Sequence, residues 1–124
     1  MAISDQSESV VLWTSLDNGC WTVHLYEGGL ESKVIYRGDH VLLSPSIAIG
    51  GDGNLWCSWV SHDSSGDSIH ILDVNENKKF SLVGRYPCLS PTREGISVCF
   101  ERLVEEESHI YFSILSDEDW SDPT

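Results

Sequence analysis

Acidic side chains are concentrated in several short polar segments of this chain. Asp63 and Asp67 bracket a polar segment between two apolar runs, and Asp39 follows a glycine where another run ends. Four more acids stand near the C-terminus, at Asp117, Glu118, Asp119 and Asp122. Calcium takes about six to eight oxygen ligands from carboxylates, backbone carbonyls and water, which loops rich in Asp and Gly supply. These residues are therefore predicted to bind calcium ions, without the spacing of an EF-hand loop.

The overall charge favours positively charged ligands. The chain carries 20 Asp and Glu against seven Lys and Arg, for a formal net charge of −13. A bound cation would relieve the repulsion among so many acids. Nucleic acid and anionic membranes are excluded as partners, because binding phosphates requires clustered basic side chains. An alternative to calcium binding is a protein-interaction module whose acidic surface engages a basic protein partner, as a mimic or an inhibitor.

Three histidines occupy similar places in the sequence. His24, His70 and His109 are each followed by two apolar or aromatic residues. The sequence repeat described below predicts a ring of similar units, and equivalent positions in such a ring lie far apart. We therefore expect each histidine to hydrogen-bond within its own unit rather than to share a metal ion with the others. The Gly-x-Ser-x-Gly turn of serine hydrolases is absent from the sequence. No catalytic residue is predicted, and binding without catalysis is the expected function.

A sequence repeat predicts the fold that positions these residues. Pro45-x7-Gly53-x3-Cys57 recurs as Pro87-x7-Gly95-x3-Cys99, a shift of 42 residues at all three anchors. A period near 40 residues, built from short strands and glycine turns, is typical of propeller blades. The sequence therefore predicts a single all-β domain of propeller-type, four-stranded antiparallel blades, about three per chain. The domain spans residues 1–124, with approximate blades at 1–40, 41–85 and 86–124.

Alternating and β-branched runs predict the individual strands. The expected strands are Glu8–Leu16, Cys20–Glu27, Lys33–Arg37, Pro45–Ile49, Leu55–Ser61, Ser68–Val74, Lys79–Val83, Pro87–Leu89, Ile96–Arg102 and Ser108–Leu115. Asn18-Gly19 supplies the positive φ angles of a tight hairpin turn. Residues 105–107 are expected to form a hairpin loop, and no window shows the periodicity of an amphipathic helix.

The number of strands predicts how the chain assembles. The third set ends after three strands, and the first lacks an innermost strand, so both ends would present unpaired strand edges. Two copies could close each other's open edges, which predicts a homodimer that completes a propeller ring. The alternative is a monomer in which Ala2 to Ser4 adds the missing strand to the third blade.

The cysteines and the N-terminal segment bear on the cellular compartment. Cys57 and Cys99 are expected at the same position of equivalent strands, where a small apolar side chain fits, and the four thiols are expected to stay reduced. The N-terminal segment lacks the apolar run of a secretory signal. No stretch approaches the roughly 20 apolar residues that cross a bilayer. A cytoplasmic location is therefore the expectation.

One segment resembles a known motif. Residues 15–21, Ser-Leu-Asp-Asn-Gly-Cys-Trp, resemble the Asp-box of sialidase-like repeats, Ser-x-Asp-x-Gly-x-x-Trp, one residue short before the Trp. Residues 116–123 resemble a degenerate copy, and residues 45–49 with 52–56 resemble the first two strands of a sialidase-like blade. The resemblance implies propeller repeats in which an Asp side chain caps backbone amides of a turn.

The same resemblance bears on function. Sialidases grip a substrate carboxylate with an arginine cluster, and the arginines of this chain stand in no such motif; they are Arg37, Arg85, Arg93 and Arg102. Sialidase activity is therefore not expected. A third hypothesis is a sugar-binding propeller, in which exposed Trp and Tyr side chains stack on a glycan. Size and acidity are also similar, in bulk properties alone, to those of a small acidic calcium-binding protein of cyanobacteria.

Overall fold

The chain is built from β-sheets throughout the part that can be described. The computed structural model describes residues 2–3, 9–27, 31–64, 66–93 and 95–116. Within these residues the strands pair into three antiparallel sheets and no helix occurs, so the all-β prediction is confirmed. The same residues contain no helix that could span a membrane.

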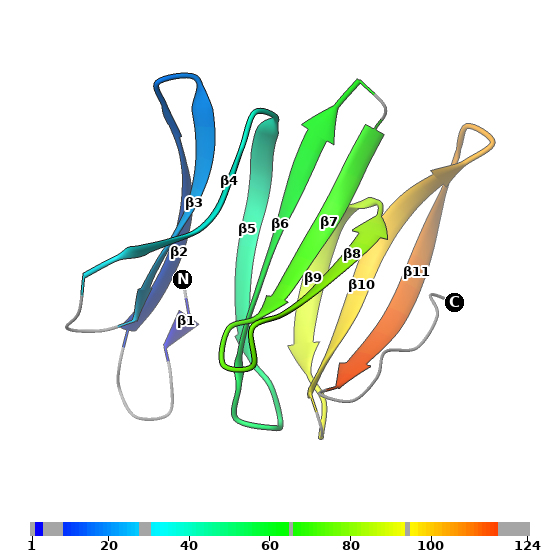
Figure 1. Cartoon of the computed structure of the whole chain (residues 1–124). Helices are drawn as coiled ribbons and strands as arrows, with labels where there is room; N and C mark the ends of the chain where they lie inside the picture. The colour runs from blue at the N-terminus through cyan, green and yellow to red at the C-terminus, as the bar shows by residue number, and fades with distance from the viewer. Residues whose placement is uncertain (1, 4–8, 28–30, 65, 94, 117–124) are drawn as a thin grey trace.

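The three sheets follow one another along the chain (Figure 1). Sheet 1 contains β1 (Ala2–Ile3), β2 (Ser9–Asp17), β3 (Cys20–Glu27) and β4 (Lys33–Gly38). Sheet 2 contains β5 (Val41–Ile49), β6 (Leu55–Asp63), β7 (Gly66–Asp73) and β8 (Lys78–Val83). Sheet 3 contains β9 (Arg85–Pro91), β10 (Gly95–Val104) and β11 (Glu107–Ser116). In each sheet, neighbouring strands are consecutive in sequence.

The tight turns follow the residues that the sequence provides. Asn18 and Gly19 have φ angles of 51° and 79°, as a two-residue hairpin turn requires. Glu105 and Glu106 adopt the same left-handed region, with φ angles of 51° and 68°, between β10 and β11. Both predicted hairpins are therefore confirmed, the second with a pair of non-glycine residues in a conformation that glycine adopts more easily.

Two apolar cores hold the sheets together. Between sheets 1 and 2, Leu12 and Leu25 pack with Trp59 in one cluster of buried side chains. Between sheets 2 and 3, Ile71 packs with Phe100 in a second cluster. Because side chains alternate across a strand, each sheet has a preceding face, toward the sheet before it in the chain, and a following face, toward the sheet after it.

The third sheet departs from the 42-residue repeat by one residue. Ile49 pairs with Leu55 across residues 50–54, whereas Pro91 pairs with Ile96 across the shorter segment 92–95. Equivalent residues of β5 and β9, the first strands of sheets 2 and 3, are thus 42 positions apart in the sequence. Equivalent residues of β6 and β10, the second strands, are only 41 positions apart. Because a one-residue shift moves every side chain to the other face of a sheet, the two second strands present different residues of the repeat to the core.

The two repeated cysteines consequently differ in environment. Cys57 lies on the preceding face of sheet 2 and is 0% exposed, whereas Cys99 is exposed on the following face of sheet 3. Its place in the core is taken by Val98. The prediction that Cys57 and Cys99 occupy equivalent positions is therefore wrong. All four cysteines are free thiols, as expected.

The N-terminal strand belongs to sheet 1. Ala2 pairs with Val10 and Ile3 with Ser9, so β1 adds a fourth strand at the edge of this sheet, although it is only two residues long. The expectation that sheet 1 lacks such a strand is wrong, and so is the alternative that this segment completes the third blade of its own chain. Sheet 3 has three strands within the described residues.

Candidate functional site

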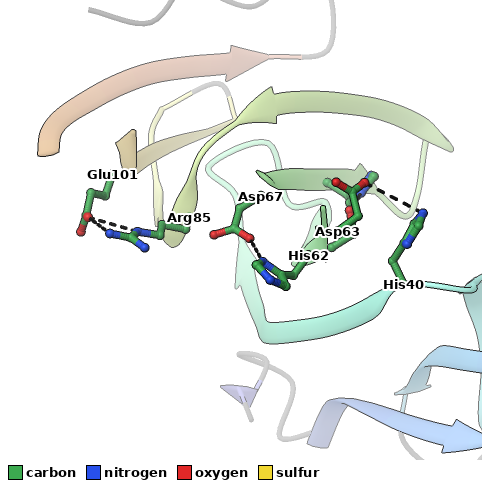
Figure 2. Close-up of polar contacts among 8 residues, drawn as sticks. His40, His62, Asp63, Asp67, Arg85 and Glu101 are labelled. Atoms are coloured by element: carbon green, nitrogen blue, oxygen red, sulfur yellow. Dashed lines mark hydrogen bonds and ion pairs between the residues drawn. The ribbon is translucent and has the colours of Figure 1, made fainter. Parts of the chain in front are cut away.

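The acidic residues predicted to bind calcium do not gather in the described part of the chain. Asp63 lies 3.9 Å from His40 Nε2, and Asp67 contacts His62 (Figure 2). Asp63 and Asp67 point to opposite faces of sheet 2, because His62 and Asp67 form a cross-strand pair while Asp63 is the next residue along β6. Asp39 is exposed between β4 and β5.

Calcium binding stays a prediction. Among the described residues, no three His, Cys, Asp or Glu side chains lie close enough together to hold a metal ion. The C-terminal acids Asp117, Glu118, Asp119 and Asp122 fall outside the described residues. Binding of a basic protein likewise stays a prediction from the net charge.

Two adjoining hollows form a cleft between sheets 2 and 3. Their volumes are about 240 Å³ and 340 Å³, and His62, Asp67 and Arg85 line both. The first hollow is also lined by Leu43, Ser44, Val60 and Tyr86. The second is also lined by Gly66, Val83, Gly84, Glu101, Arg102 and Leu103. Charged side chains of both sheets thus gather around this cleft, among them Asp67, Arg85 and Glu101.

Hydrogen bonds fix the charged side chains of the cleft. Arg85 donates from Nε and Nη2 to Glu101 Oε1, at 3.1 Å and 2.7 Å, and the Ser108 hydroxyl donates to the same oxygen. Figure 2 shows this pair beside the contact between His62 and Asp67. The hydrogen bond from Ser108, and then that from Arg85, lower the pKa of Glu101, so this side chain is a carboxylate at neutral pH.

Arg102 adds a second cation to the cleft. Its Nε donates to the Val83 carbonyl at 2.8 Å, and its guanidinium carbon lies 4.8 Å from the ring centroid of Tyr111. These contacts hold the guanidinium in place over an aromatic ring. Arg85 and Arg102 are two of the four arginines in a strongly acidic chain. The cleft is therefore less acidic than the protein as a whole.

Tyr86 forms the aromatic rim of the cleft. It is 64% exposed, and the guanidinium carbon of Arg85 lies 5.2 Å from its ring centroid. Its φ of 53° lies in the left-handed region, which costs a non-glycine residue about 1–2 kcal/mol. Ser44 has the same φ at the equivalent position of sheet 2, and both residues precede a proline. The backbone bend therefore belongs to the repeat, but the exposed ring belongs to sheet 3 alone.

Two of the histidines, His24 and His70, make the same hydrogen bond and ring contact, each within its own sheet. His24 Nε2 lies 2.7 Å from Ser15 Oγ and its ring stacks on Trp13, while His70 bonds to Ser61 at 2.8 Å and stacks on Trp59. The prediction of hydrogen bonds within each repeat is confirmed for both.

His109 does not share this arrangement. It pairs across the strands with Arg102. The ring pair of sheet 3 that is equivalent to Trp59 with His70 is instead Phe100 with Tyr111. The prediction that His109 occupies the position equivalent to His24 and His70 is wrong, because it aligned the histidines by the apolar residues that follow them, whereas the strand pairing places Tyr111 at that position.

A serine, a histidine and an aspartate meet on sheet 1, but not as a catalytic triad. The Ser15 hydroxyl donates to Asp17 Oδ2 at 2.7 Å, so its single proton is directed away from His24. In a triad the aspartate instead orients the far ring nitrogen of the histidine, and the histidine accepts the serine proton. The same bond recurs between Ser61 and His70 of sheet 2, which indicates that it serves to join two neighbouring strands.

Aspartates do cap the loops at one end of sheet 2. Asp52 Oδ1 accepts from the Asn54 backbone amide at 3.0 Å. Asp73 Oδ1 accepts from the backbone amides of Asn75 and Glu76, and Asp73 Oδ2 accepts from the Asn54 side chain. This is the role that the Asp-box resemblance implies for an aspartate, although the motif at Asp17 makes its hydrogen bond to Ser15.

The cleft could not be recognised from the sequence. Arg85 and Glu101 are 16 residues apart and meet only because β9 pairs with β10 in this register. One signal was present: the residue before the repeated proline is serine in one copy and tyrosine in the other. Comparison with known proteins adds no family, since no protein-family model and no curated protein sequence matches the chain.

Proposed function

We propose that the protein binds a sugar in the cleft between sheets 2 and 3, without catalysing a reaction on it. The observation that carries this proposal is the exposed ring of Tyr86, which lies beside paired charged side chains. At the equivalent position, Ser44 meets the needs of the fold without an aromatic ring.

The chemistry of the cleft suits a polyhydroxylated ligand. A sugar ring presents C–H groups that pack on an aromatic face and hydroxyls that both donate and accept hydrogen bonds. Asp67 and Glu101 supply carboxylate acceptors, and Arg85 and Arg102 supply donors. One hollow, of about 240 Å³, is smaller than the usual range for ligand pockets of about 300–1,000 Å³, and the other, of about 340 Å³, is at its small end, which favours a ligand of one or two rings.

The lowered pKa of Glu101 favours binding over glycoside hydrolysis. A glycosidase needs one carboxyl group with a raised pKa to protonate the leaving oxygen. The pKa of Glu101 is instead lowered by Ser108 and Arg85. Glu101 is therefore suited to accept hydrogen bonds from ligand hydroxyls, and not to act as an acid.

We further infer that the three sheets are consecutive blades of a propeller. The support is the repeated interface, in which the following face of one sheet packs on the preceding face of the next, in both cores. The cleft then lies between two neighbouring blades, with Ser44 on the first strand of one and Tyr86 on the first strand of the other.

A glycan array followed by titration calorimetry tests the sugar proposal. Tyr86→Ser copies the residue that the repeat tolerates at Ser44, so it should fold while losing at least tenfold in affinity. Tyr86→Phe keeps the ring and should retain binding. The matched control is Val34→Ser, at an exposed apolar residue of sheet 1 remote from the cleft. An array without hits for the unmodified protein, or equal affinity for Tyr86→Ser, would exclude a sugar site at this cleft.

Chelation separates this proposal from calcium binding. Sugar affinity that is unchanged in excess chelator assigns recognition to the cleft side chains alone. Affinity that is lost in chelator and restored by calcium would instead tie ligand binding to the acidic loops.

A further inference from the structure

The two ends of the row of sheets each leave one apolar face uncovered in the described part of the chain. On the following face of sheet 3, Ile110 is 70% exposed and Phe112 and Ile114 are 43% and 44% exposed. They alternate along β11, with Cys99 beside Phe112 on the neighbouring strand. We call these four residues the sheet 3 end face.

The equivalent residues of sheet 2 are fully buried. The β6–β7 and β10–β11 hairpins both turn over two residues, and this makes Ile69 equivalent to Ile110 and Ile71 to Phe112. Ile69 and Ile71 are 0% and 1% exposed, because sheet 3 packs on them. Ile110 and Phe112 therefore repeat the apolar centre of a covered interface, without a sheet to cover them among the described residues.

Sheet 1 offers the other half of such an interface. On its preceding face, Val11, Trp13 and Tyr26 are only partly buried. Their equivalents in sheet 2 are Cys57, Trp59 and Leu72, which are buried where sheet 1 packs on them. We call these three residues of sheet 1 the sheet 1 end face.

We propose that a second copy of this chain covers the sheet 3 end face with its own sheet 1 end face. The two end faces are the two halves of the interface that already occurs twice inside the chain, so they are complementary to each other and not to themselves. Contact between them is head to tail, and two copies then form two identical contacts. The assembly is a closed ring of two chains with three described sheets each. This inference is independent of whether the cleft binds a sugar.

Electrostatic repulsion opposes this contact and gives it a characteristic salt dependence. Each chain has a formal net charge of −13, whereas the seven residues of the two end faces are uncharged. Glu101, which pairs with Ile110 at the margin of the sheet 3 end face, forms an ion pair with Arg85 of its own chain. Raising the ionic strength screens the repulsion between the chains and leaves apolar contacts intact. The dimer should therefore become tighter between 0.05 and about 0.5 M salt, opposite to an assembly held by ion pairs.

Light scattering tests the assembly, and charge substitutions test its geometry. The unmodified chain should show twice the 13.8 kDa mass of one copy. Phe112→Lys and Trp13→Glu, each placed on one end face, should both give monomers. Leu16→Lys is the matched control, because Leu16 is an exposed apolar residue outside both end faces. Ile110→Lys and Val11→Glu are the second variants, in case the first of either pair does not fold.

Mixing the variants distinguishes head-to-tail contact from other arrangements. The Trp13→Glu chain keeps an intact sheet 3 end face, and the Phe112→Lys chain keeps an intact sheet 1 end face. A mixture should therefore recover dimers held by one contact. Cys99 should also react with a maleimide at least tenfold faster in the Phe112→Lys monomer than in the unmodified dimer.

Three results would overturn the proposal. The unmodified chain could remain monomeric at high salt and millimolar concentration. Trp13→Glu and Val11→Glu could leave the dimer intact while Phe112→Lys breaks it, which would indicate a contact between two sheet 3 end faces. The mixture of variants could remain monomeric while each chain is folded by circular dichroism.

Discussion

Replacing Asp73 by alanine should strongly destabilise the fold, because this buried carboxylate joins two loops at one end of sheet 2. Asp73 is 0% exposed. It accepts from the backbone amides of Asn75 and Glu76 at 3.1 Å and 3.2 Å, and from Asn54 Nδ2 at 3.0 Å. Alanine leaves all three donors without this acceptor.

The size of the effect follows from those three bonds. Each donor that loses its partner in a buried site costs about 1–3 kcal/mol, and the lower value applies here because all three bonds are partly accessible. The expected loss for Asp73→Ala is therefore about 3 kcal/mol, a large part of the roughly 5–15 kcal/mol that stabilises a small domain. Asp73→Asn keeps an acceptor oxygen for the two backbone amides and should cost about 1 kcal/mol, with Asn54→Ala in the same range.

Urea unfolding followed by tryptophan fluorescence measures these free energies. Asp73→Ala and Asn54→Ala share one hydrogen bond, so their combined effect should fall short of the sum by about 1 kcal/mol. Strict additivity of the double variant would show that the bond between Asp73 and Asn54 contributes nothing. A loss below about 1 kcal/mol for Asp73→Ala would contradict the assignment of this residue as the anchor of the two loops.

Three further predictions concern packing, pH and thiol reactivity. Gly51→Ala should lower the free energy of unfolding by about 3 kcal/mol, since the added Cβ would lie 1.8 Å from the Thr92 carbonyl oxygen. Gly53→Ala should lower it by only about 1 kcal/mol, because the site has open space and the cost comes from its φ of 83°. Equal losses in urea unfolding would contradict this contrast. Burial lowers the pKa of His70, so the unfolded chain takes up a proton at this histidine before the folded protein does. The free energy of unfolding should therefore be constant above about pH 6.5, the ordinary pKa of histidine, and fall as the pH drops below it. Urea midpoints at two pH values should show the fall, and His70→Phe should reduce it. Burial also raises the pKa of Cys57 to about 12, so a maleimide at neutral pH should label exposed Cys88 and leave Cys57 unlabelled until the protein unfolds; labelling of Cys57 in the folded protein would contradict its burial.

The strands and turns were predictable because their signals are local. The run from Leu55 to Ser61 alternates between two buried faces, and Asn18-Gly19 has the conformational freedom that a two-residue hairpin demands. Neither signal depends on contacts with distant parts of the chain. The expected strands accordingly occur with ends shifted by a few residues.

The faces of sheet 3 were not predictable in this way. Gly53 and Gly95 align in sequence, but Gly53 lies in a turn with positive φ, while Gly95 begins β10. Which face Cys99 occupies depends on how β10 pairs with β9 and β11, and the position of Cys99 in the sequence repeat does not specify that register. The sequence repeat alone therefore assigned the wrong side of the sheet.

The cleft depends on register even more strongly. Arg85 and Glu101 form a close pair because a bulge shifts the β9–β10 register between the pair Cys88–Cys99 and the pair Arg85–Glu101. Tyr86 turns outward at the same irregularity. Patterns of residue type identify acids and aromatics along the chain, but they do not locate a bulge. The sequence therefore predicted a site at the acidic loops and not at the cleft.

The consecutive order of the strands has a consequence for how the chain acquires its structure. Every hydrogen-bonded pair of neighbours in the three described sheets joins strands that follow each other in sequence. Contacts of short sequence separation require little loop closure before they form, and proteins dominated by them fold faster than β-proteins with crossed connections. A hairpin can therefore form as soon as its second strand leaves the ribosome, and each completed sheet can serve as the surface on which the next one condenses.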